Sequence, residues 1–173
     1  MVNPSYPSDN EPWELAPANA HPAAVAALTE PWYWDSEDEL SPFGNDTGAD
    51  VLSLFQQWRQ EHPSESPSVF LAELLQDWQV PDTGWNEEDP TRLRALVEAE
   101  DYGLTTRDEI IIALALGEAI VEGRIDPKIL EMARVATRRR LLPVMLEALG
   151  GEADEARERY EHIRGVLAND WQG

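Results

Sequence analysis

The chain has 173 residues, no cysteine and a formal net charge of -21. This length suits one compact domain, and the lack of cysteine excludes disulfides, thiol chemistry and cysteine-ligated zinc. The negative field repels nucleic-acid phosphates and anionic lipids, so neither a nucleic acid nor a membrane is an expected partner. No apolar run approaches the roughly 20 residues that span a bilayer, and the N-terminus lacks a signal-peptide pattern, which predicts a cytoplasmic protein.

The charge is unevenly spread along the chain. Residues 1–91 carry 18 Asp and Glu against a single basic residue, Arg59, whereas residues 92–173 carry 16 against 12. Twelve of the 13 basic residues are arginine, which favours fixed ion pairs more than lysine does. We therefore expect internal pairing in the second half. The acidic first half is read either as a device for solubility or as a surface that recognises a basic protein.

In chain order, residues 1–20 are rich in Pro, Asn and Ser and predict a flexible arm. A short helix is expected over 23–29, opened by Pro22 and ended by Pro31. The next stretch is irregular until Asp46 or Thr47, either of which is a suitable N-cap for a helix that stops at His62-Pro63. A further helix is expected from Ser66-Pro67 to Trp78 and another from Asp89-Pro90 to near Gly103.

The central helix is expected over Ile110–Val121, where few positions are polar. Thr106 and Glu109 predict a capping box at its start, and Gly123 predicts its C-terminal stop. Helices are then expected from Asp126-Pro127 to Leu142, over 144–149 after a break at Pro143, and over 153–167. The sequence thus predicts an all-α bundle of seven or eight helices, with one domain over 21–173 and the arm over 1–20.

Three groups of polar residues are weighed as chemical sites. A loop of oxygen ligands can hold Ca²⁺ or Mg²⁺, but the spacing here does not match an EF-hand, and a solvated loop explains it as well. Glu118 and Glu122 lie one helical turn apart, yet they also fit the exposed edge of their helix. The basic run 138–140 points in three directions on a helix, which favours ion pairs to the acidic first half. The weak metal candidates are Asp35, Asp46 and Asp50.

Enzymatic motifs are absent from the sequence. The three histidines are scattered without a zinc-binding spacing, and no nucleophile elbow or Gly-rich phosphate loop appears. Seven tryptophans are many for this length, and tryptophan anchors cores and interfaces alike. If residues 32–34 are extended, Trp32 and Trp34 point the same way. Trp34 and Phe43 are interpreted as core residues, with exposure toward a partner as the alternative.

Residues 21–59 contain a His-Pro start, a Trp-Asp step, a Pro-Phe-Gly step and an Asn-Asp/Gly-Ala-Asp run into a helix. The residues that form these motifs are His21, Pro22, Trp34, Asp35, Pro42, Phe43, Gly44, Asn45, Asp46, Gly48, Ala49 and Asp50. In these motifs the segment resembles the YfeS-like group of uncharacterised bacterial proteins. The resemblance implies an all-helical bacterial protein and carries no established chemistry.

The functional hypothesis is a non-catalytic, acidic protein–protein interaction module for a basic partner, with an immunity or inhibitor protein as one concrete form. The alternative is a divalent-metal protein or enzyme that uses Asp35, Asp46 and Asp50. A homodimer that buries the tryptophan segment is a third reading. No cofactor is expected. The expected partner-binding residues are Trp32, Trp34, Asp35, Glu37, Asp38 and Glu39.

Overall fold

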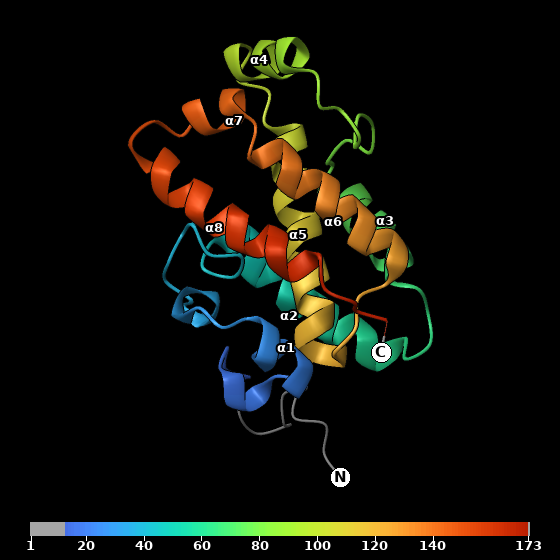
Figure 1. Cartoon of the computed structure of the whole chain (residues 1–173). Helices are drawn as coiled ribbons and strands as arrows, with labels where there is room; N and C mark the ends of the chain where they lie inside the picture. The colour runs from blue at the N-terminus through green and yellow to red at the C-terminus, as the bar shows by residue number, and fades with distance from the viewer. Residues whose placement is uncertain (1–12, 173) are drawn as a thin grey trace.

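The computed structural model describes residues 13–172, and every regular element in this range is helical (Figure 1). Three short 3₁₀-helices accompany eight α-helices, so the predicted all-α fold is confirmed for the described residues. Residues 1–12 of the predicted arm lie outside them. The elements are η1 Pro17–Asn19, α1 Pro22–Ala27, η2 Pro31–Trp34, α2 Asp46–Glu61, α3 Pro67–Asp77, α4 Pro90–Glu98, α5 Gly103–Glu122, α6 Pro127–Arg140, α7 Pro143–Glu147, η3 Gly150–Glu152 and α8 Ala153–Leu167.

Helix α5 is the axis of the fold. Every residue from Ile110 to Val121 is buried, because α2 and α6 pack closely along it and α1 and α3 cover parts of it (Figure 1). The spacing between α2 and α5 is tight, since a Cβ on Gly117 would lie 3.4 Å from Leu52 Cδ1. Burying one Leu or Ile side chain stabilises a fold by about 1.5–3 kcal/mol. The run of buried aliphatics on α5 is therefore the main source of core stability.

The start of α5 differs from the prediction. The helix begins at Gly103, one turn before the expected site, and Thr106 N donates to Tyr102 O at 2.8 Å inside the helix. The predicted capping box of Thr106 and Glu109 is therefore wrong. Instead, Asp101 Oδ1 accepts a hydrogen bond from the Gly103 amide at 3.2 Å. Gly123 ends the helix at φ 71° as predicted, in the left-handed conformation that favours glycine.

The N-cap of α2 is also corrected. Asn45 takes that position, and its Oδ1 accepts from Gly48 N at 2.8 Å, so Asp46 and Thr47 fall inside the first turn. Asn is as good an N-cap as Asp, and the chain simply starts the helix one residue earlier. Pro143 behaves as predicted, because α6 ends at Arg140 and α7 starts anew at this proline.

Helices α4 and α7 build a small second core at one end of the molecule, at the top of Figure 1. Its buried members are Leu93, Val144 and Met145, separate from the main core around α5. At the opposite end, Trp13 and Leu15 pack against the main core. Among the described helices, none is both long and apolar enough to cross a membrane.

Candidate functional site

The tryptophan segment, Pro31–Trp34, forms the 3₁₀-helix η2, so its three aromatic side chains do not alternate as they would in a strand. Tyr33 is the buried member, and its hydroxyl lies 2.7 Å from His162 Nδ1 on α8. Burial raises the pKa of Tyr33 well above its usual range. The segment is thereby fixed to α8, which lies beside it in Figure 1.

Trp32 and Trp34 are both half-buried. The Trp34 indole donates to Leu28 O at 3.1 Å, and the ring of Trp32 lies 5.2 Å from the guanidinium carbon of Arg159. Phe43 is buried in the core as predicted. The two tryptophans thus combine a packing role with partial exposure.

Arg159 connects the acidic loop, residues 35–39, to α8. This side chain is only 9% exposed. It forms ion pairs with Asp38 of the loop and with Glu155 on its own helix, the latter at 2.7 Å. Its Nη1 also lies 3.3 Å from Ser41 Oγ. One buried cation therefore holds the loop against α8 and uses Asp38 as an internal partner.

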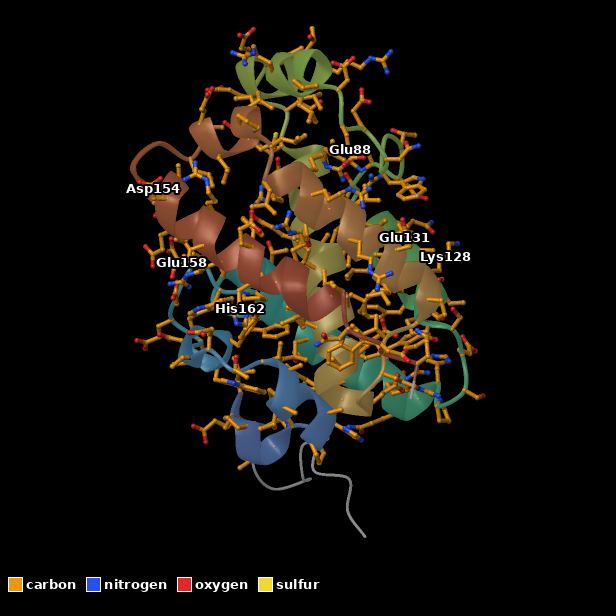
Figure 2. All side chains as sticks on the ribbon, viewed as in Figure 1. Glu88, Lys128, Glu131, Asp154, Glu158 and His162 are labelled. Carbon is orange, nitrogen blue, oxygen red and sulfur yellow. The ribbon has the colours of Figure 1, made fainter. Side chains whose placement is uncertain are left out.

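The remaining loop carboxylates, Asp35, Glu37 and Glu39, are exposed to solvent. Asp35 Oδ1 accepts from the Glu37 amide at 2.9 Å, which shapes the turn and leaves both side chains exposed. Figure 2 shows Asp154, Glu158 and His162 in succession along one side of α8. We define the acidic face as the exposed carboxylates around Arg159, namely Asp35, Glu37, Glu39, Glu155 and Glu158.

The contribution of α8 to this face is not evident from the sequence. Glu155 and Glu158 stand more than 110 positions after the loop. The available signal is Arg159, a cation directly after Glu158 on an acidic helix. Glu39 and Glu152 also line one small cavity of about 200 Å³, which places the loop and the start of α8 side by side.

The metal candidates are not gathered into a cluster. Asp46 and Asp50 lie on α2 and are exposed, and Asp35 lies in the loop with Oδ1 engaged by the turn. Within residues 13–172 there is no group of three or more His, Asp or Glu arranged to hold a metal ion. Metal binding by Asp35, Asp46 and Asp50 stays a prediction.

Burial sorts the charges strongly by sign. The described residues include 32 of the 34 carboxylates, all but Asp9 and Glu11, and all 13 basic side chains. Only two of these carboxylates are buried, against five arginines. The described side chains that reach the surface therefore comprise 30 carboxylates and 8 cations. The surface is more acidic than the composition alone indicates. The buried arginines are Arg59, Arg107, Arg139, Arg140 and Arg159.

The predicted ion pairs of the basic run exist, with a change of partner for two members. Arg138 pairs with Glu88 of the first half at 3.0 Å, as expected. Arg139 pairs with Asp108 at 2.5 Å and Arg140 with Glu109 at 3.2 Å, both on α5 in the second half. Because α6 packs against α5, its arginines meet the carboxylates of that helix first.

Glu118 is the main correction among the candidate acids. It is 1% exposed and does not lie at an exposed edge of its helix. Burial, with smaller contributions from Asp126 and Glu122, raises its pKa from 4.5 to about 9. Glu118 lines a cavity of about 320 Å³ at the C-terminal end of α5. The helical period predicts that it shares a face with Glu122, but only the packing of α2 and α6 makes that face interior.

Comparison with known proteins finds a relative among curated bacterial proteins. The chain is 27% identical over 150 residues to the uncharacterized protein YfeS of Escherichia coli (strain K12). The match covers 86% of this chain and 62% of YfeS, so the chain spans less than two thirds of that relative's length. The resemblance to the YfeS-like group that residues 21–59 predicted is thereby confirmed. No family model matches the sequence, and no solved structure matches it either.

Proposed function

We propose that this chain, similar to an uncharacterised bacterial protein, works as a non-catalytic module that binds a basic protein through its acidic face. The observation that carries the proposal is the sorting of charge, with 30 carboxylates and 8 cations at the described surface. A field of one sign attracts an oppositely charged partner and raises the association rate. An immunity or inhibitor protein that covers a basic toxin is one concrete form of such a module.

The acidic face is favoured over the rest of the acidic surface for two reasons. Its loop is held rigidly, because Arg159 and Tyr33 tie it to α8, so little ordering entropy opposes binding. It also lies beside the half-buried ring of Trp32, and aromatic residues are enriched at the centres of interfaces.

The test neutralises the acidic face and compares it with an equal change elsewhere. The first variant combines Asp35→Asn, Glu37→Gln, Glu39→Gln and Glu158→Gln, which leaves the Arg159 ion pairs intact. The matched control changes the exposed residues of other helices. Both variants remove four negative charges, so any difference between them reports the position of the charge. The control substitutions are Glu61→Gln, Glu73→Gln, Asp77→Asn and Glu98→Gln.

Affinity capture from the source bacterium, followed by mass spectrometry, identifies the partner, and calorimetry with that purified protein measures the affinity. We expect the acidic-face variant to bind at least about tenfold more weakly, a difference of about 1.4 kcal/mol, and the control variant to bind nearly as the wild type does. The wild-type affinity should fall between 50 and 300 mM NaCl because salt screens exposed charges. Equal loss in both variants would reject the acidic face as the binding site.

A further inference from the structure

The cavity that Glu118 lines lies where two interhelix turns meet. One turn, 62–66, joins α2 to α3, and the other, 123–126, joins α5 to α6. Gln172 near the C-terminus closes part of the wall, and its Nε2 donates to Ile125 O at 3.0 Å. This site is separate from the acidic face.

One carboxyl oxygen of Glu118, which lines this wall, has no hydrogen-bond partner among the described residues. Its Oε1 accepts from the Asp126 amide at 3.2 Å, whereas Oε2 is buried without a hydrogen-bond partner in the described structure. Buried polar atoms are nearly always paired, and an exception calls for a physical reason such as a missing ligand. Glu118 lines the cavity, so a partner bound there would lie next to this carboxyl group.

The charges that face Glu118 leave room for one more cation. Glu122 is balanced by Arg59 at 2.6 Å, and Arg59 also donates to the carbonyls of His62 and Glu65 at 2.9 and 2.8 Å. Asp126 Oδ1 caps α6 by accepting from two backbone amides, and within the described residues Asp126 forms no ion pair with a cation. The other charged residues in the wall, Glu65 and Arg124, are exposed at its rim.

We propose that this cavity binds the ammonium group of a primary amine, with Glu118 Oε2 and the Asp126 carboxylate as hydrogen-bond acceptors. An ammonium group has three donors and one positive charge, which match an orphan oxygen and an unpaired carboxylate. The volume of about 320 Å³ lies at the small end of ligand pockets, which suits a short amine or the tip of a lysine side chain. The described residues contain no cluster arranged for a metal ion.

Binding is coupled to the loss of one proton. With a pKa of about 9, Glu118 is a neutral carboxylic acid at pH 7. When a protonated amine enters, the Glu118 O–H bond breaks and the proton passes to the buffer. The products are a carboxylate–ammonium pair and one buffered proton, so charge and atoms balance. The nearby positive charge then keeps Glu118 ionised.

Calorimetry with ethylammonium chloride at pH 7.5 and 150 mM NaCl tests the proposal. Titrations in phosphate and Tris, which differ in ionisation enthalpy, count the protons released. We expect saturable binding with close to one proton released per amine. Tetramethylammonium, which has no N–H donor, should bind at least tenfold more weakly. Nα-acetyl-lysine amide, which keeps its side-chain ammonium group, serves as the probe for a lysine side chain. Its affinity relative to that of ethylammonium shows which source of ammonium the cavity prefers.

Two variants locate the site. Glu118→Gln keeps the shape of the neutral acid and should weaken ethylammonium binding at least tenfold and abolish proton release. Asp126→Asn retains a capping oxygen and should also weaken binding, while proton release from Glu118 persists in the bound fraction. Glu73→Gln, far along α3, is the control and should bind as wild type. Circular dichroism checks folding. Absence of saturable binding in the wild type, or unchanged binding in Glu118→Gln, would overturn the proposal.

Discussion

The two ends of α5 bury charge in opposite ways. Near its N-terminal end, Asp108 receives two hydrogen bonds from Arg139, at 2.8 and 2.5 Å, and both side chains are at most 1% exposed. Arg139 also donates to the carbonyls of Trp85 and Glu87, so every side of the guanidinium is engaged. Near the C-terminal end, Glu118 has one hydrogen bond and no cation bound to it.

This contrast shows how burial selects the protonation state. Burial raises the pKa of Asp108, but the hydrogen bonds and charge of Arg139 oppose the shift. At Glu118 the opposing contributions are a single backbone hydrogen bond and the more distant Arg59, so burial prevails and the carboxyl keeps its proton. A planar guanidinium with fixed donors thus offsets part of the cost of burying a carboxyl group inside this bundle.

The largest expected effect comes from breaking the Arg139–Asp108 pair near the N-terminal end of α5, which we call the closed end. Arg139→Met leaves Asp108 buried without its cation and frees the two loop carbonyls. Removing one partner of a buried pair costs about 3–5 kcal/mol, so the free energy of unfolding in urea at pH 7 should fall by that amount. A loss below about 1 kcal/mol would mean that water or another group satisfies Asp108.

The second effect is the pH dependence of stability that arises from Glu118, near the C-terminal end of α5, which we call the open end. Between pH 4.5 and about 9 the folded protein holds a proton on Glu118 that the unfolded chain has released. The stability of the wild type therefore falls as pH rises through this window, by up to about 1.4 kcal/mol per pH unit from this group. Glu118→Gln removes that contribution, because the amide does not titrate.

Urea unfolding of wild type and Glu118→Gln at pH 6, 7 and 8 measures this difference. We expect the variant to gain stability relative to wild type at each step. Parallel curves for the two proteins would show that Glu118 ionises with an ordinary pKa and that the two ends of α5 do not differ.

A smaller effect tests the backbone at the open end. Gly123 adopts φ 71°, and a Cβ there would lie 2.2 Å from the ring of His21, whose side chain caps α1. Gly123→Ala should cost at least about 1–2 kcal/mol in urea unfolding. The control is Gly165→Ala on α8, where a Cβ meets nothing within 4 Å and should stabilise by about 0.5–1 kcal/mol. Similar effects in both variants would contradict this role for Gly123.

The smallest effect is expected at the surface pair that neighbours the closed end. Arg138 is one residue before Arg139 but is half exposed and pairs with an exposed Glu88. Exposed pairs contribute about 0–1 kcal/mol, so Arg138→Met should lower the free energy of unfolding by no more than that. A loss as large as that of Arg139→Met would show that the change acts on α6 as a whole and not on the buried pair.

Much of the secondary structure follows from local chemistry that the sequence displays. Pro67, Pro90 and Pro127 each occupy a first helical turn, and Gly123 ends α5, because proline lacks an amide donor and glycine tolerates positive φ. The starts of α2 and α5 were misplaced because several residues in a row can cap a helix. Tertiary packing then selects Asn45 in one case and the turn at Asp101 in the other.

Which charged side chains are buried could be determined only from the tertiary structure. In the sequence, Glu118 and Glu158 are both glutamic acids within predicted helices. Arg138 and Arg139 are adjacent in the chain. Which of them is buried depends on which helix packs against that face, and this information is distributed over residues far apart in the chain. Composition and helical periodicity alone determined an acidic, all-helical protein. Only the tertiary packing decided which charged side chains are buried. It removes five arginines from the protein surface, lets Arg159 connect the loop 35–39 to α8, and raises the pKa of Glu118 so that it stays protonated.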